Sequence, residues 1–129
     1  MTKKIKKYAL LIIWCGVLFL FSSIPNAKIS TDTLMDLIIR KSLHFTNYFI
    51  LYVIAYKTFN KKGLKTLIFC AIYALSDEAH QFFVEGRGPS LWDALIDTLG
   101  AFFGMIVIWN NWNQHLLKII LKLQKGFLK

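Results

Sequence analysis

Residues 8–24 have the sequence YALLIIWCGVLFLFSSI, a largely apolar run without a charged side chain. A helix that crosses a bilayer needs ~20 mostly apolar residues, with a range of ~17–25. Three further stretches of suitable length follow, at residues 43–59, 64–84 and 91–109. Of the 129 residues, 56% are hydrophobic and 18% are charged, whereas soluble domains average ~45–50% and ~25%. The sequence therefore predicts an all-α integral membrane protein built as a four-helix bundle.

The four stretches differ in how strongly hydropathy supports them. Hydropathy alone identifies the first stretch and most of the third. The second contains His44 and Asn47, and the fourth contains Asp93 and Asp97 near its start. Because a charged group costs ~2.5–3.5 kcal/mol near the centre of a spanning helix, we expect hydropathy to be least decisive for these two. The first stretch also resembles a signal peptide, but we expect it to stay as an anchor because Pro25 suits a cleavage site poorly.

Lysine and arginine residues are divided unevenly between the two ends of these helices. One side carries twelve of them: Lys3, Lys4, Lys6, Lys7, Lys57, Lys61, Lys62, Lys65, Lys118, Lys122, Lys125 and Lys129. The other side carries four: Lys28, Arg40, Lys41 and Arg87. All seven acidic residues also lie toward that second side: Asp32, Asp36, Asp77, Glu78, Glu85, Asp93 and Asp97. Since cytoplasmic loops are enriched in cations, both termini are predicted to be cytoplasmic (N-in/C-in).

Residues 113–129 form a basic segment that follows the bundle of residues 1–112. Its lysines recur at helical spacing, with apolar residues covering most of the remaining surface. This pattern is typical of a C-terminal amphipathic interfacial helix on the inner membrane surface. We expect a simple anchor, with a role as lipid sensor or partner-docking helix as the alternative. Trp109 and Trp112 fit an interfacial aromatic belt. The predicted partner is the lipid bilayer, and we expect no nucleic acid because the basic face is not that of a soluble domain.

Small side chains inside the apolar stretches have simple interpretations. Cys15 and Cys70 are expected to fill space as small apolar groups, without a disulfide or redox role. Gly100 and Gly104 form a small-xxx-small pair that lets another helix approach closely. We expect that approach within one chain rather than at a dimer interface, and the oligomeric state stays open.

Ionisable side chains within apolar helices are costly and usually face a bundle interior. Residues three or four apart share a helix face, which gives three polar stripes: Lys41, His44 and Tyr48; Asp77, His80 and Gln81; Asp93 and Asp97. Glu78 is turned ~100° from Asp77, so we expect one of these two acids to serve a site and the other to brace a neighbouring helix. Like charges four residues apart repel, so a cation or shared proton is expected beside the third stripe.

The three stripes are predicted to lie at one depth. With a rise of ~1.5 Å per residue, Asp97 lies ~9 Å inside Leu91 and Asp77 lies ~10 Å inside Val84. Three helices would then bring polar groups to the outer third of the bilayer. This arrangement predicts a pocket that opens to the outside of the cell.

The segment 85–90, EGRGPS, is expected to cover this pocket. Pro89 is predicted to end the third helix and Ser90 to cap the fourth. Arg87 would then lie at the rim, where its guanidinium could pair with Asp93 or bind an external phosphate or carboxylate. The candidate ligand-binding residues are Lys41, His44, Tyr48, Asp77, Glu78, Gln81, Arg87, Asp93 and Asp97. The alternative is that these charges only neutralise one another and hold the helices together.

Over most of its length, roughly residues 14–104, the chain is similar to the VanZ-like family of bacterial membrane proteins. The resemblance rests on an ordered set of motifs: Trp14, Ser22-Ser23, Lys41-x-x-His44-x-x-x-Tyr48, Asp77-Glu78-x-x-Gln81, Gly86-Arg87, Asp93, Gly100 and Gly104. Asp97 departs from the family pattern, which usually has Asn there, and this adds a carboxylate. The resemblance implies a multi-pass protein of the bacterial plasma membrane, linked to the low-level teicoplanin resistance for which the family is named. It implies no particular reaction.

Three classes of function remain open. The first is a binding or protective module for an anionic lipid head group, a cell-wall precursor pyrophosphate or the glycopeptide antibiotic, with Trp92 as a stacking surface. The second is an intramembrane enzyme acting on a lipid or cell-wall precursor, in which the acids and histidines hold a divalent metal or transfer protons. No HExxH, nucleophile or phosphate-loop motif is present, so we assign no catalytic residue, metal or cofactor. The third is a small transporter subunit, although the inner half of every predicted span lacks ionisable residues.

Overall fold

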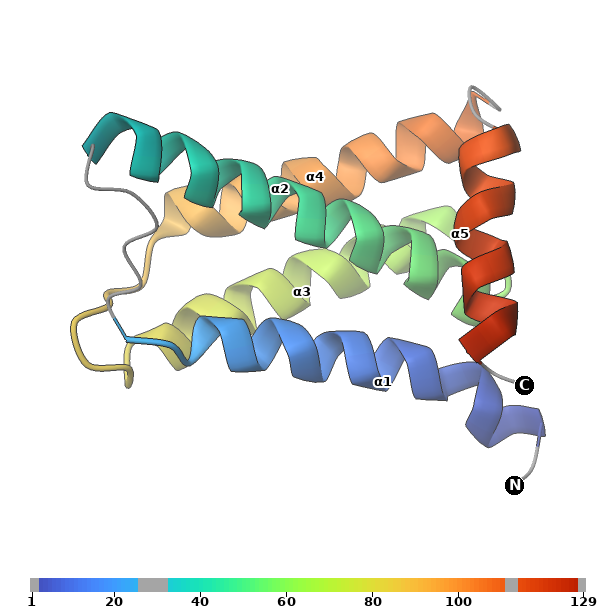
Figure 1. Ribbon diagram of the computed structural model, residues 1–129, viewed down its shortest axis with the longest axis horizontal. Helices are drawn as coiled ribbons and strands as arrows, with labels where there is room; N and C mark the ends of the chain where they lie inside the picture. Colours follow the sequence, from blue (N-terminus) through green and yellow to red (C-terminus); the bar gives the residue numbers. More distant parts are fainter. Residues whose placement is uncertain (1–2, 26–32, 111–113, 128–129) are drawn as a thin grey trace.

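A computed structural model describes residues 3–25, 33–110 and 114–127. Within these ranges the chain is helical and contains no strand, which confirms the predicted all-α class. The five described helices are α1 (Lys3–Ser22), α2 (Thr33–Thr58), α3 (Gly63–Gln81), α4 (Leu91–Trp109) and α5 (Gln114–Phe127) (Figure 1). Predictions placed on Lys28, Asp32, Trp112 and Lys129 lie outside the described residues. The side chains of the N-terminal lysines Lys3, Lys4, Lys6 and Lys7 are not described either.

The ends of two helices differ from the sequence prediction. α2 begins at Thr33 rather than near residue 43. Asp36 stabilises this added length because an acid in the first turn complements the helix dipole, and its carboxylate accepts a hydrogen bond from Arg40 Nε at 2.8 Å. α3 ends at Gln81, so the prediction that Pro89 ends it is wrong. The turn that follows Gln81 breaks the helix well before the proline is reached.

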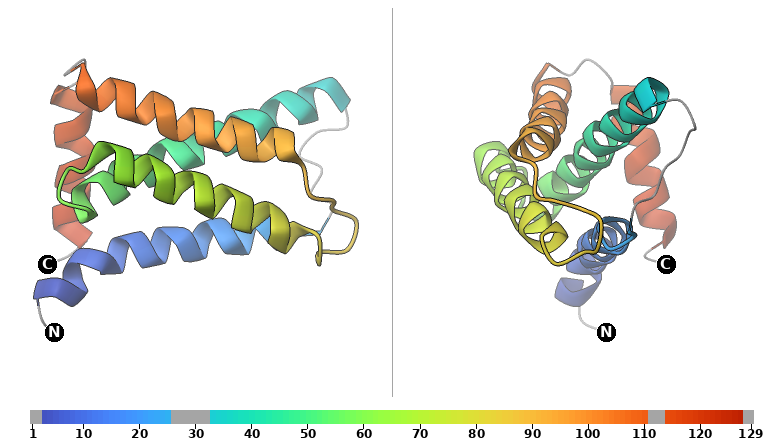
Figure 2. Two further views of the ribbon diagram at one scale, coloured as in Figure 1. Left: turned by 180° about the vertical axis from the view of Figure 1, so that it is seen from behind. Right: turned by 90° about the vertical axis from the view of Figure 1, so that its left-hand side faces the viewer.

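Helices α1 to α4 lie side by side along the long axis of the molecule, and α5 lies across one end of them (Figures 1 and 2). The most extensive contact joins α2 to α4. Two glycines of α4 allow it: a Cβ at Gly100 would collide with the main chain of Phe45, and one at Gly104 would lie 3.1 Å from the Tyr52 ring. At both glycines, α4 therefore approaches α2 closely within one chain, as predicted.

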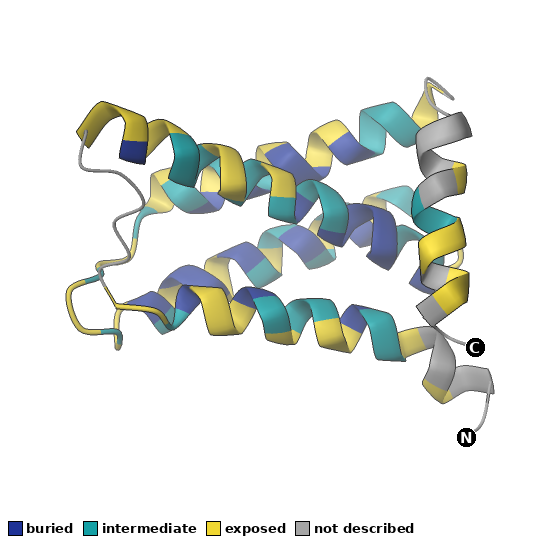
Figure 3. Ribbon diagram, in the orientation of Figure 1, coloured by how far each residue is buried: buried dark blue, intermediate teal, exposed yellow. Residues whose placement is uncertain are grey.

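The buried core is small and lies on the facing sides of the four long helices (Figure 3). It includes Leu51, Tyr52 and Ala55 of α2, with Cys70 and Ala74 of α3 against them. Both cysteines are free thiols. The outward faces carry exposed large apolar side chains, among them Ile12, Leu20, Ile72, Phe83 and Leu91. An exposed apolar surface of this kind is typical of contact with lipid or with a partner protein.

Among the described residues, α4 is the one helix long and apolar enough to cross a membrane by length and composition. The apolar part of α1, Tyr8–Ser22, is shorter than that test requires. The prediction that hydropathy favours residues 8–24 and is indecisive over residues 91–109 is therefore wrong. The two acids of α4, Asp93 and Asp97, lie in its first two turns, so most of the helix is uninterrupted apolar sequence.

Charge is segregated along the long axis. The described lysines of the α2–α3 turn and of α5 gather at the end of the molecule where α5 lies (Figure 1). The buried acids Asp36, Asp77, Glu78 and Asp97 all belong to the opposite half of their helices. On α5, Lys118, Lys122 and Lys125 are exposed. The side chains of His115, Leu116, Leu117 and Ile119 are not described, so the apolar face predicted for this helix is not tested.

Candidate functional site

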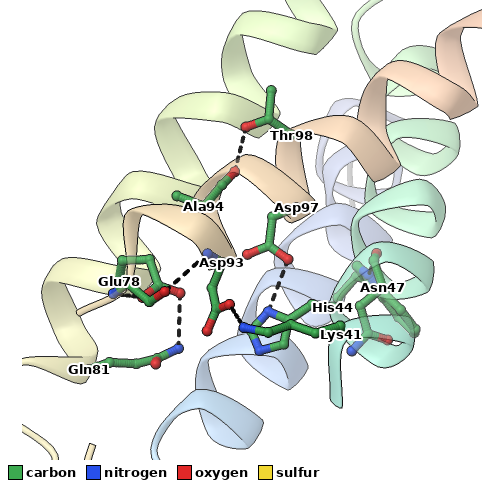
Figure 4. A network of polar contacts seen from close by, with 11 residues as sticks. Lys41, His44, Asn47, Glu78, Gln81, Asp93, Ala94, Asp97 and Thr98 are labelled. Atoms are coloured by element: carbon green, nitrogen blue, oxygen red, sulfur yellow. Dashed lines mark hydrogen bonds and ion pairs between the residues drawn. The ribbon is translucent and has the colours of Figure 1, made fainter. Parts of the chain in front are cut away.

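Two polar contacts join α2 to α4 near the end that lies opposite α5 (Figure 4). Lys41 of α2 forms an ion pair with Asp93 of α4. One helical turn further along, His44 Nδ1 lies 3.0 Å from Asp97 Oδ1. Each acid of the α4 stripe therefore has its own cationic or hydrogen-bonding partner. These partners offset the repulsion between Asp93 and Asp97, two like charges four residues apart on one helix face.

Glu78 connects α3 to the start of α4. Its Oε2 accepts a hydrogen bond from the Ser90 main-chain N–H at 2.7 Å, and its Oε1 accepts a longer one from Gln81 Nε2 at 3.4 Å. Ser90 is the N-cap of α4, where its side chain accepts a hydrogen bond from the Asp93 N–H. Of the two acids left open by the sequence, Glu78 is thus the one that braces a neighbouring helix.

A cavity of about 210 Å³ lies between α1, α2, α3 and the α3–α4 loop. Its polar wall combines residues from three helices and the loop, namely Ser22, Arg40, His44, Asn47, Tyr48, Asp77, Gln81 and Arg87. Its apolar wall consists of Leu18, Phe21, Ile24 and Leu43. The chain contains two arginines, and both of them line this cavity although they are far apart in sequence.

Arg87 does not pair with Asp93, so that part of the prediction is wrong. Its Nη1 donates to the main-chain carbonyls of Phe21 at 3.3 Å and Ser22 at 2.8 Å. The last carbonyls of a helix have no partner within it, so the end of α1 offers acceptors to a cation. The α3–α4 loop reaches across to this end of α1 (Figure 2). Arg87 forms no ion pair with any residue that the structure describes.

Several buried polar atoms in the cavity wall and in the polar cluster behind it have no hydrogen-bond partner among the described residues. They are Ser22 Oγ, Tyr48 Oη, Asp77 Oδ1 and Asp97 Oδ2. Leaving a polar atom buried without a partner costs ~1–3 kcal/mol, so native proteins keep few of them. Four such atoms around one small region are typical of a site that receives a bound molecule or ion. His80, by contrast, is engaged within the bundle, with its Nε2 2.9 Å from Ser23 Oγ.

The structure divides the nine candidate residues into two adjoining groups. Those that line the cavity are His44, Tyr48, Asp77, Gln81 and Arg87. Those that lie behind it, between α2, α3 and α4, are Lys41, Glu78, Asp93 and Asp97. His44 belongs to both regions because it lines the cavity and contacts Asp97.

Arg40 and Asn47 line the cavity and are not among the predicted site residues. Their spacing could have found them, because Arg40, His44 and Asn47 are four and three residues apart on α2. Trp92 was proposed as a stacking surface for the ligand, and this is wrong. Its side chain is 71% exposed and does not line the cavity, because position 92 lies on the outward face of the first turn of α4.

Comparison with known proteins supports one family assignment. No protein of curated function and no solved structure matches the chain. A family model described as VanZ/LLP1 matches residues 7–117, which include the cavity and the polar contacts behind it. That match covers most of the chain, and it agrees with the resemblance carried by the motifs from Trp14 to Gly104. The protein belongs to the VanZ/LLP1 family.

Proposed function

We propose that this protein is a multi-pass protein of the bacterial plasma membrane, with α1 to α4 crossing the bilayer and both termini in the cytoplasm. Membership of a generally membrane-associated family, together with one membrane-capable helix, supports this proposal. The exposed apolar faces of the other three helices support it as well. Lysines at one end and acids at the other follow the charge bias expected for a cytoplasmic and an outer side. The cavity would then face the outer leaflet.

We propose further that the cavity binds the phosphate-bearing head group of an envelope lipid. The observation that carries this proposal is Arg87, which lines the cavity without an acidic partner among the described residues, beside Arg40, which pairs with Asp36. Guanidinium groups bind phosphate through paired N–H donors in a fixed geometry. Arg87 donates through Nη1 to two neutral carbonyls and has no acidic partner among the described residues. Its charge and remaining donors are therefore suited to an anion.

The remaining walls favour an amphiphile. Phe21, Ile24 and Leu43 are exposed and lie beside the polar wall, so acyl chains could stay in lipid while a head group enters. Asp77 Oδ1 would accept a hydrogen bond from a hydroxyl or ammonium group of that head group, and Tyr48 Oη would donate one to a hydroxyl or phosphate oxygen. A cavity of about 210 Å³ is smaller than the ~300–1,000 Å³ of sites for drug-sized ligands. Its size supports a head group over a whole glycopeptide antibiotic.

The inner end of the cavity supports a binding site over a transport path. Beyond Tyr48, α2 continues with the buried residues Leu51, Tyr52, Val53, Ile54 and Ala55. Ions and protons need ionisable or hydrated groups along their route through a membrane. A core of this composition closes the cavity toward the cytoplasmic side.

The test is a binding measurement on the purified full chain in detergent micelles. A short-chain phosphatidylglycerol is the probe, and the matched diacylglycerol without phosphate is the control ligand. We expect the protein to bind the phospholipid but not the diacylglycerol. The affinity for the phospholipid should fall about tenfold or more in Arg87→Gln, because one charged hydrogen-bonding group is worth ~1.5–3 kcal/mol. The affinity of Arg87→Lys should lie between those of Arg87→Gln and the wild type, because lysine keeps the charge and loses the paired N–H donors of the guanidinium group.

Lys122→Gln serves as the matched control variant, since Lys122 is exposed on α5, away from the cavity. It removes the same charge and should bind the probe as the wild type does. Equal weakening in Arg87→Gln and Lys122→Gln would mean that net charge alone attracts the lipid, and would refute the cavity as the site. In cells, Arg87→Gln at unchanged membrane abundance should remove any contribution of the protein to teicoplanin resistance.

A further inference from the structure

Behind the cavity, three helices each contribute one metal-ligating side chain to a common point. His44 of α2, Glu78 of α3 and Asp97 of α4 each place a ligand atom so that the three atoms lie within 4.8 Å of one another. The two carboxylates are almost fully buried, with 3% of Glu78 and none of Asp97 exposed. One imidazole and two carboxylates form a ligand set that zinc and other first-row divalent ions accept.

An unpartnered carboxylate oxygen points into this cluster. Asp97 Oδ1 is engaged with His44, but Asp97 Oδ2 is buried and has no hydrogen-bond partner among the described residues. In Figure 4, Oδ2 lies on the side of Asp97 that faces Glu78. A carboxylate oxygen removed from water in this way is costly unless a proton or a cation reaches it.

The local charge balance also leaves room for a cation. Asp77, Glu78 and Asp97 are all buried in this region. None of the nearby arginine or lysine side chains that the structure describes forms an ion pair with these three acids: Lys41 pairs with Asp93, Arg40 pairs with Asp36, and Arg87 donates to the main-chain carbonyls at the end of α1. Buried carboxylates are stable when they are paired or coordinate a metal. We propose that His44, Glu78 and Asp97 bind a divalent metal ion of the zinc class.

The hydrogen bonds of the cluster suit this role. Ser90 N–H holds Glu78 Oε2, while Oε1 accepts only a 3.4 Å hydrogen bond from Gln81 and is the freer oxygen for a metal. A backbone donor on a ligating carboxylate is a typical orienting contact around metal sites. Ligands at ~2.0–2.1 Å in a tetrahedron stand ~3.3 Å apart. Because the three ligand atoms already lie within 4.8 Å of one another, a bound ion would draw them together by no more than ~1.5 Å.

The experiment measures metal uptake by the full-length protein in detergent after treatment with a chelator. With Zn²⁺ as the probe, we expect about one equivalent bound per chain by elemental analysis after desalting, and a higher thermal unfolding midpoint. Glu78→Gln and Asp97→Asn keep side-chain size and remove one ligand charge each. We expect them to lose ~100-fold or more in Zn²⁺ affinity, beyond the ~10–100-fold typical of orienting residues.

Two controls separate this result from other causes. Glu85→Gln makes the same chemical change at an exposed acid of the loop and should bind Zn²⁺ as the wild type does. Arg87→Gln should also keep its metal, so that failure of the lipid proposal and failure of the metal proposal give different results. The visible spectrum of the Co²⁺-loaded wild type reports nitrogen and oxygen ligation without any variant. The proposal is overturned if the wild type binds neither Zn²⁺ nor Co²⁺, or if Glu78→Gln and Asp97→Asn retain wild-type affinity.

Discussion

The contact between α2 and α4 leads to a sharp prediction at Gly100. A Cβ placed there would come within 3.0 Å of the Phe45 carbonyl carbon and Cα and would overlap the carbonyl oxygen. These are main-chain atoms inside a helix, so they cannot move aside as a flexible side chain can. Gly100→Ala must therefore push α4 away from α2.

The size of the effect follows from the distances. Carbon atoms in favourable contact stand ~3.5–4.0 Å apart, and the overlap with the Phe45 carbonyl oxygen is deeper than the overlap with the two carbons. The two helices must therefore separate by ~1 Å or more. Overpacking of this kind typically costs ~1–3 kcal/mol. The displacement also strains Lys41–Asp93 and His44–Asp97, because both contacts bridge the same two helices. We expect the cost to reach the upper part of that range and to be accompanied by weaker Zn²⁺ binding.

The assay is unfolding of the purified protein in a titration from mild detergent into dodecyl sulfate, followed by circular dichroism. Gly16→Ala is the matched control, since nothing lies within 4 Å of a Cβ at that position on α1. Alanine is favoured over glycine in a helix by ~0.5–1 kcal/mol, so Gly16→Ala should be neutral or slightly stabilising. A clash at Gly100 is refuted if Gly100→Ala has the same unfolding midpoint as the wild type, or if Gly100→Ala and Gly16→Ala destabilise the protein equally.

Three further predictions concern single polar contacts, each measured by the same unfolding titration. A double-mutant cycle with Lys41→Met and Asp93→Asn should give a coupling energy of ~1–3 kcal/mol, which lies between the values typical of exposed and of fully buried ion pairs. A coupling energy near zero would mean that the ion pair does not form. Ser90→Ala should cost ~0.5–2 kcal/mol because α4 loses its N-cap acceptor, whereas Ser90→Asn should recover most of that loss. Tyr73→Phe should cost ~0.5–1.5 kcal/mol because its hydroxyl donates to the Cys15 carbonyl at 2.7 Å; an unchanged midpoint would exclude that hydrogen bond.

Much of the helical pattern could be predicted from local sequence. The bounds of α4 agree with the predicted 91–109, because Ser90 is a strong N-cap and the apolar run ends at Trp109. The early start of α2 was missed, because residues 33–42 are mixed in polarity and their helix depends on Asp36 and Arg40. The predicted weakness of α4 in hydropathy is wrong, because the cost of a charge depends on its depth in the membrane and both acids of α4 lie near the start of the helix.

The periodicity of the chain by itself determined which polar side chains share a helix face, since the 3.6-residue turn is a local property. It did not determine which face meets which. Arg87 binds the end of α1 rather than Asp93. Glu78 lies close to His44 and Asp97, whereas Asp77 lines the cavity. Both arrangements depend on how far each helix is rotated and shifted against its neighbours. Those rotations are set by close packing between distant segments, above all at Gly100 and Gly104, and only the tertiary structure decides them.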